Sequence, residues 1–133
     1  MEDTKMEDVT EIIDMLDWNM PSEIQFKGRI LAKNVETIIP FIQPLTPKNN
    51  KNVWENCAII IAEESDEKLK PHLVKLLEWL QDMNWPGAFR ILDRLKKYSD
   101  NNSIHTAIKI CVDKAEACND EVWKSNLHLL LQR

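Results

Sequence analysis

Apolar residues recur at spacings of three and four along most of the chain, which is the period of a helix that buries one face. The clearest stripe lies in the middle of the sequence and consists of Leu69, Leu73, Leu76, Leu77 and Leu80. A second stripe consists of Ile104, Ala107, Ile108, Cys111, Ala115 and Cys118. The unbroken apolar run from Cys57 to Ala62 predicts a helix that is buried on most sides. The pattern therefore predicts a chain of amphipathic helices.

Polar breaks and prolines divide this pattern into seven or eight helices. We expect them at residues 7–16, 22–34, 53–64, 69–80, 87–98 and 104–118 and from residue 120 onward, with a shorter segment at 35–42 that Pro40 interrupts. Ser22, followed three residues later by Gln25, has the spacing of a capping box at the start of the second helix. The polar stretch from Pro47 to Asn52 predicts a linker. The last helix carries Val122, Leu127, Leu130 and Leu131.

Glycine occurs only twice among 133 residues, at Gly28 and Gly87. A β-sandwich or barrel needs many tight turns with residues that tolerate positive φ, and two glycines cannot supply them. The length is that of one domain. The chain is therefore predicted to be a single all-α domain over residues 1–133.

Two predicted loops share one pattern 65 residues apart. The first reads Asp17-x-Asn19-x-Pro21, and the second reads Asp82-x-Asn84-x-Pro86. The repetition favours a tandem duplication of a unit of about 65 residues, although similarity between helical segments also arises by chance. A duplication implies stacked helical hairpins, a HEAT-like α-solenoid in which each pair buries its face against the next.

The densest group of unusual side chains surrounds the second loop and consists of Trp79, Asp82, Asn84 and Trp85. As a binding surface, it would offer tryptophan anchors beside fixed polar groups. As a structural turn, Asp82 or Asn84 would accept hydrogen bonds from free backbone N–H groups, and Trp85 would pack over the joint. The structural interpretation is favoured, because a hairpin turn is needed in both copies of a repeat and a catalytic site is not.

No arrangement of residues typical of an enzyme or a metal site is present. Cys57, Cys111 and Cys118 lack the close pairing of zinc ligands and are expected to fill the core, and the histidines form no ligand pair. Two isolated glycines exclude phosphate-binding loops and nucleophile elbows. We therefore expect no catalytic residue, no metal and no cofactor. A basic patch on one helix consists of Arg90, Arg94, Lys96 and Lys97.

Charge and hydropathy limit the partners and the compartment. With 22 acids and 17 bases the net charge is −5, which argues against binding to nucleic acid. The longest apolar run is far shorter than the ~20 residues that span a membrane. The acidic start from Met1 to Lys5 is unlike a secretion signal, and an odd number of cysteines fits a reducing compartment. We expect a cytoplasmic protein.

The stretch from Leu76 to Ala88, which reads LLEWLQDMNWPGA, resembles a bacterial family known as domain of unknown function 5071. Further matching segments are Leu45–Lys48, Ser65–Leu69 and Asp120–Lys124, so the resemblance covers roughly residues 45–131. The chain departs from the family at Asn49–Asn52 and at Gly87, and residues 1–44 read as additional N-terminal helices. The resemblance implies a compact HEAT-like helical fold and implies no activity.

These features favour a non-enzymatic, cytoplasmic module that binds another protein. One alternative is an immunity-type protein that neutralises a cognate bacterial toxin, since an acidic face suits a basic target. Another is a small enzyme that uses the Asp82/Asn84/Trp85 loop. Homo-oligomerisation through exposed tryptophans is a further alternative.

Overall fold

The computed structural model describes residues 6–44 and 50–132, and in these residues the chain is helical without any strand. Residues 1–5 and 45–49, which include the predicted linker residues 47–49, lie outside the described part. The principal helices are α1 (Met6–Met15), α2 (Ser22–Ala32), α3 (Trp54–Ala62), α4 (Asp66–Leu69), α5 (Leu73–Glu78), α6 (Ala88–Lys96), α7 (Asn101–Ala117) and α8 (Glu121–His128). Single 3₁₀ turns are η1 (Ile39–Phe41), η2 (Lys51–Val53), η3 (Lys70–His72), η4 (Trp79–Gln81) and η5 (Leu129–Gln132). The prediction of an all-α fold is confirmed.

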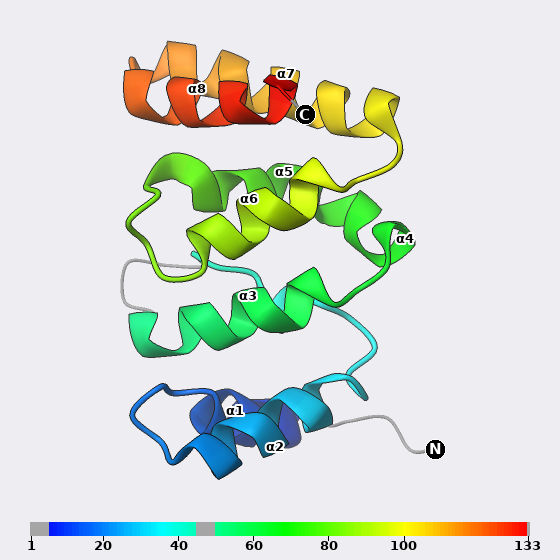
Figure 1. Ribbon diagram of the computed structural model, residues 1–133, viewed down its shortest axis with the longest axis vertical. Coiled ribbons are helices and arrows are strands. Elements are labelled where there is room, and N and C mark those ends of the chain that lie inside the picture. The colour runs from blue at the N-terminus through cyan, green and yellow to red at the C-terminus, as the bar shows by residue number, and fades with distance from the viewer. Residues whose placement is uncertain (1–5, 45–49, 133) are drawn as a thin grey trace.

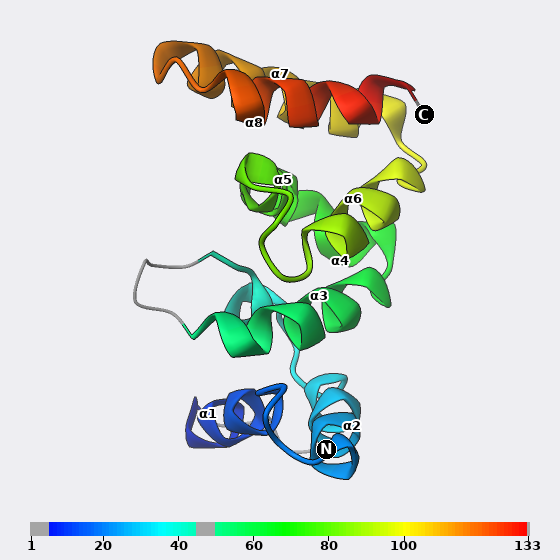
Figure 2. The ribbon, with the colours of Figure 1, turned by 60° about the vertical axis from the view of Figure 1, so that its left-hand side comes forward.

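The helices form layers along the long axis of the molecule (Figure 1). Helix α1 packs on α2 at one end, α3 lies against η1 in the next layer, α5 and α6 follow, and α7 and α8 close the other end. Contacts between layers run from α2 to α3 to α6 and from α5 to α7. A second view shows the same succession of layers from the side (Figure 2). Each layer therefore buries its apolar face mainly against the layers next to it.

The leucine stripe at 69–80 is buried as predicted, but the helix that carries it is not continuous. All five leucines have exposed fractions of 4% or less. The chain passes through α4, η3, α5 and η4, and the break at η3 falls at Pro71, which has no N–H to donate and whose ring disturbs the regular turn. Short 3₁₀ turns thus keep the apolar side toward the core while the backbone bends.

Two expectations about helix ends are wrong. Pro21, not Ser22, is the N-cap of α2 and makes no side-chain cap, so the capping box does not form. Cys118 is the C-cap of α7 and is exposed, because the helix ends before the buried stripe can continue. In the last helical segment, Val122 of α8 and Leu131 of η5 are 63% and 49% exposed, whereas Leu127 of α8 and Leu130 of η5 are buried.

Candidate functional site

The loop after η4 is a turn centred on Asp82 that reverses the chain between α5 and α6. The backbone N–H of Asn84 donates to the Asp82 carboxylate at 2.8 Å, and the N–H of Trp85 donates to the Asp82 carbonyl at 3.0 Å. The loop ends at Gly87, which adopts φ +86° immediately before α6. Asp82 therefore accepts a hydrogen bond from the loop itself and not from the start of the next helix.

The two tryptophans beside this loop pack around a third one. Trp79 and Trp85 present their rings edge-on to Trp54, with centroid distances of 6.2 Å and 5.4 Å. Trp79 is fully buried, and its indole N–H donates to the Pro86 carbonyl at 2.9 Å. Of the four residues predicted as a site, the structure thus places Trp79 in the core, leaves Asp82 and Trp85 half-buried, and exposes Asn84.

The Asp-x-Asn-x-Pro loop between α1 and α2 has the same turn. The N–H of Asn19 donates to the Asp17 carboxylate at 2.8 Å, and the Asn50 amide donates to its other oxygen at 2.9 Å. These hydrogen bonds hold the pKa of Asp17 below its usual 3.8. The Gln25 side chain donates to the carbonyls of Trp18 and Met20, which is why it is not available for the predicted capping box. Hydrogen bonds from Asn50 and Gln25 therefore fix this loop against the segment before α3 and against α2.

Residues 17–21, 50–53 and 82–87 come together along one edge of the stack, which we call the loop edge. The N–H of Trp18 donates to the Asn52 carbonyl at 3.0 Å, so the first loop touches the segment that precedes α3. The Lys51 ammonium lies 5.6 Å from the Trp54 ring centroid and 5.9 Å from that of Trp85. Such distances are typical of cation–π contacts. Lys51 therefore joins the linker segment to the second loop.

The first turn of α3 contributes two polar residues, Glu55 and Asn56, that no sequence motif identified. Asn56, 3% exposed, donates to the Leu16 carbonyl at 2.7 Å and to the Gln25 side chain at 2.9 Å, and it accepts from Arg29 at 2.6 Å. Glu55 accepts from the N–H of Gly87 at 3.0 Å and forms an ion pair with Arg90. The sequence offered one indication of this role: Asn56 directly precedes the apolar run from Cys57 to Ala62. An amide buried beside such a run requires hydrogen-bond partners.

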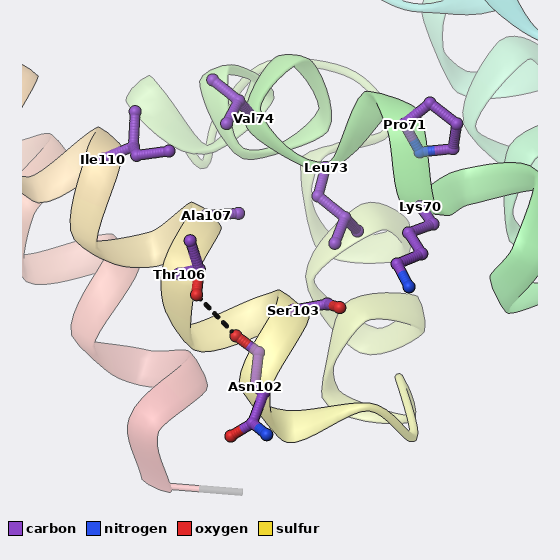
Figure 3. A pocket seen from close by; sticks show the side chains of 9 residues that line it. All are labelled: Lys70, Pro71, Leu73, Val74, Asn102, Ser103, Thr106, Ala107 and Ile110. Carbon is purple, nitrogen blue, oxygen red and sulfur yellow. Dashed lines mark hydrogen bonds between the residues drawn. The ribbon is translucent and has the colours of Figure 1, made fainter.

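Two surface cavities lie away from the loop edge. An apolar groove of about 360 Å³ separates η3 and α5 from α7, and Figure 3 shows the side chains that line it. A hollow of about 460 Å³ between α3, α4 and α6 is lined by Ala62, Asp66, Arg90, Asp93, Arg94 and Lys97. The predicted basic patch contributes to this hollow, but acids neutralise its two arginines, with Arg94 paired to Asp66 at 2.6 Å and Arg90 to Glu55. The two arginines of the patch are consequently held in ion pairs, while Lys96 and Lys97 are exposed.

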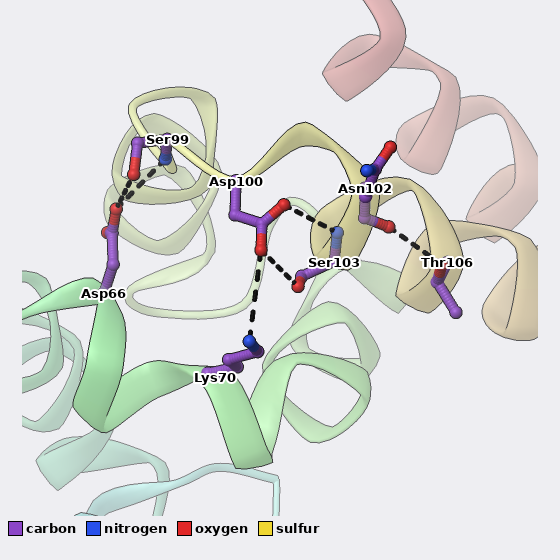
Figure 4. Close-up of polar contacts among 7 residues, drawn as sticks. All are labelled: Asp66, Lys70, Ser99, Asp100, Asn102, Ser103 and Thr106. Carbon is purple, nitrogen blue, oxygen red and sulfur yellow. Dashed lines mark hydrogen bonds and ion pairs between the residues drawn. The ribbon is translucent and has the colours of Figure 1, made fainter.

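Asp66 connects α4 to the turn between α6 and α7 (Figure 4). Its carboxylate accepts from the N–H and the hydroxyl of Ser99 at 3.0 and 2.8 Å and from Arg94. Burial alone would raise the pKa of Asp66, but the bonds from Ser99 and Arg94 outweigh it and hold the pKa below 3.8. Next to it, bonds from Ser103 lower the pKa of Asp100, the N-cap of α7.

Because these carboxylates have a lower pKa when folded than when unfolded, their contribution to stability is present above pH 3.8 and is lost as the pH falls through the folded values. We expect the urea midpoint to fall between about pH 5 and pH 2. In Asp66→Asn, the midpoint should be lower at pH 5 and should depend less on pH. An unchanged pH dependence in that variant would assign the effect to other groups.

For Asp82→Ala, we expect a loss of about 0.5–2 kcal/mol in the free energy of unfolding, the scale of a lost side-chain cap. Thermal melts followed by circular dichroism measure it. Asn84→Ala is the matched control, since its backbone N–H, which makes the bond, is retained. A variant at Asp82 as stable as the wild type would leave this carboxylate without a structural role and favour the enzyme hypothesis.

The cysteines differ sharply in exposure. Cys57 and Cys111 are buried and Cys118 is exposed. Burial raises the pKa of Cys57 to about 12 and that of Cys111 to about 11, so neither provides a thiolate nucleophile near neutral pH. Within residues 6–44 and 50–132, no three His, Cys, Asp or Glu side chains are close enough together to hold a metal ion.

An aromatic disulfide reagent at about pH 8 should therefore titrate a single thiol in the native protein and all three after unfolding in urea. The assay is the absorbance of the released thiolate. Cys118→Ser should abolish the fast reaction while leaving the unfolded chain with the other two thiols. Rapid reaction of that variant in its native state would contradict the burial of Cys57 and Cys111.

Taken together, the described residues form a layered, all-helical protein whose polar loops serve to join its layers, and none of the described helices has the length and apolarity to cross a membrane. The chain belongs to the family described as domain of unknown function (DUF5071), whose model matches residues 45–133. This confirms the resemblance inferred from the LLEWLQDMNWPGA stretch. No curated protein and no solved structure matches the chain.

Proposed function

We propose that the chain is a HEAT-like stack of helical hairpins built from two related units of about 65 residues. The shared turn of the two Asp-x-Asn-x-Pro loops supports this relation. A second correspondence lies in two side-chain amides: Asn56, which is buried, donates to the Leu16 carbonyl at 2.7 Å, and Asn126, which is half-buried, donates to the Leu80 carbonyl at 2.8 Å. In each case an asparagine of a later helix bonds to a carbonyl just ahead of the loop.

The function that we propose is non-enzymatic binding of another protein through the loop edge. The observation that carries this proposal is the contrast between the two loops. Trp18 and Met20 are 47% and 40% exposed, whereas the corresponding Met83 and Trp85 pack against the core. Exposed tryptophan on a fixed loop is characteristic of interface anchors, because little conformational entropy is lost when it is covered.

Hydrogen bonds fix the backbone of Trp18 before any partner binds. Its backbone is held through the Asn52 carbonyl and the Gln25 amide, at 3.0 and 3.1 Å. Ile24, 36% exposed, lies four residues after Met20 on the first turn of α2 and extends the apolar surface. We call Trp18, Met20 and Ile24 the anchor patch.

The net charge of −5 favours a partner with a neutral or basic surface. The alternative of an immunity-type protein that neutralises a bacterial toxin is supported by this acidity alone. We propose a location in the bacterial cytoplasm, which the family resemblance and the odd number of cysteines favour.

The test is affinity capture from a lysate of the host with three tagged chains: wild type, Trp18→Ala and the control Phe89→Ala. Phe89 is 63% exposed on α6, so its replacement removes an exposed aromatic ring elsewhere. We expect a stoichiometric protein, identified by mass spectrometry, on the wild type and control but not on Trp18→Ala. A partner retained equally by all three chains would exclude the anchor patch, and a basic, toxic partner would identify the immunity-type function.

A further inference from the structure

The solvent side of α2 carries apolar residues that no other described element covers. Phe26 is 58% exposed and Ile30 is 46% exposed, one helical turn apart on the same face. Figure 2 shows α2 at the outer corner of the stack, packed against α1 and open on its other side. Terminal layers of stacked helical repeats normally present a polar outer face. The exposed apolar face of α2 is therefore suited to pack against another protein surface.

The charges that border these residues follow a definite order. Glu23 precedes them, Lys33 follows them, and Lys27 lies between, all exposed and without an ion pair to any other residue in the described ranges. The spacing of positions 23, 26, 27, 30 and 33 keeps them on one stripe. We call these five residues the α2 stripe. It is acidic at its N-terminal end and basic at its C-terminal end, and its centre carries Phe26 and Ile30 with Lys27 between them.

We infer that the α2 stripe is the interface of a symmetric homodimer, in which α2 packs antiparallel on α2 of a second copy. A two-fold axis at the level of Gly28 brings Phe26 against the partner's Ile30 and Glu23 against the partner's Lys33. Both contacts occur twice, because a two-fold interface uses the same patch on each subunit. A second copy is thus complementary to the Phe26 and Ile30 contacts and to the two charged ends of this stripe, while Lys27, beside the axis, takes no part in these pairs.

The order of charges also excludes the parallel arrangement. Parallel packing would place Glu23 and Lys33 each against its own counterpart, and like charges in contact are unfavourable. Glu23 and Lys33 are ten residues apart, about 15 Å along the helix, so both can pair with a partner helix of equal length. The exposed ion pairs chiefly set the orientation, while burial of the apolar centre supplies the affinity.

Phe26 is held ready for such a contact. The guanidinium of Arg29 lies 5.8 Å from the centroid of its ring, and Arg29 is itself fixed by its bond to Asn56 at 2.6 Å. The ring is therefore restrained on one side while most of it remains exposed, so less side-chain entropy is lost on association. A single pair of short helices buries little area, so we expect a weak dimer that dissociates on dilution.

Sedimentation equilibrium of the purified chain measures this association, and no other protein needs to be present. Over about 5–500 µM, the mass should rise from that of the 15.6 kDa chain toward twice that value. Phe26→Ser should weaken dimerisation at least about tenfold, since it removes both copies of the apolar contact. Phe89→Ser, at a ring 63% exposed on α6, is the control and should dimerise as the wild type does.

Charge reversal tests the antiparallel pairing itself. Glu23→Lys and Lys33→Glu should each dimerise at least about tenfold more weakly than the wild type, because each places like charges together twice. An equimolar mixture of these two variants should associate again, since both cross-pairs become attractive. Circular dichroism verifies that every variant is folded. A wild type that stays monomeric over the whole concentration range would overturn the inference. The inference would also be wrong if Phe26→Ser dimerised as strongly as the wild type, or if the mixture of the two charge variants associated no more than either variant alone.

Discussion

Replacing Gly87 by alanine should lower the free energy of unfolding by about 2–4 kcal/mol. Gly87 adopts φ +86°, a conformation that costs an L side chain about 1–2 kcal/mol. The added Cβ would also lie 2.7 Å from the Ala58 Cβ and 3.0 Å from the Trp54 carbonyl oxygen. Backbone and α3 would both have to shift, because neither neighbour is the end of a flexible side chain.

Urea unfolding followed by circular dichroism measures this loss, and Gly28→Ala is the matched control. A Cβ at Gly28 would also be close to its neighbours, 2.9 Å from the Met15 Cβ, but Gly28 lies within α2 and has no positive φ. Alanine there gains up to about 1 kcal/mol in helix propensity, which offsets part of the crowding. The variant at Gly87 should therefore be clearly the less stable of the two. Equal stability would show that the turn relaxes without strain.

Trp79→Ala should be the most destabilising of the substitutions considered, at about 3–5 kcal/mol. The ring is fully buried against Trp54, and the change also removes the hydrogen bond of 2.9 Å to the Pro86 carbonyl. Loss of that bond leaves a carbonyl of the second loop without its partner. The loop and the core are thus weakened by a single substitution.

Two companion variants separate these contributions by the same measurement. Trp79→Phe retains most of the apolar volume without the N–H, so we expect a loss of about 1–2 kcal/mol. Trp18→Ala, at an exposed tryptophan, should remain within about 0.5 kcal/mol of the wild type. If Trp79→Ala were as stable as Trp18→Ala, the aromatic cluster would have no structural importance, and Trp79 would merit study as a contact residue.

Helical periodicity was sufficient to predict the fold class and most of the core. The leucine stripe from Leu69 to Leu80 is buried because its spacing of three and four determines which side of the helix faces inward. Periodicity does not describe the path of the backbone. The break at Pro71 and the early end of α7 before Cys118 depend on local geometry that a stripe of apolar residues does not report.

The site was predicted only in part, because its organisation comes from contacts between distant segments. The sequence identified the loop around Asp82 and its turn character. It gave no indication that Lys51 would lie over Trp85, or that Trp18 would be exposed while its counterpart Met83 packs on the core. The two loops have the same local pattern, so only the layers around them determine which apolar side chains remain in solvent.

The amide of Asn56 has a consequence for how the chain unfolds. Asn56 belongs to the family-matched residues 45–133, whereas its acceptor Leu16 lies in the layer before them. If the first layer opened alone, the Asn56 amide would exchange its partners Leu16, Gln25 and Arg29 for water, at a net cost of about 0.5–1.5 kcal/mol for each hydrogen bond. Hydrogen exchange in α2 and α3 should therefore report one cooperative opening. The edge of the family match marks a limit of sequence similarity, while the unit that folds extends across it.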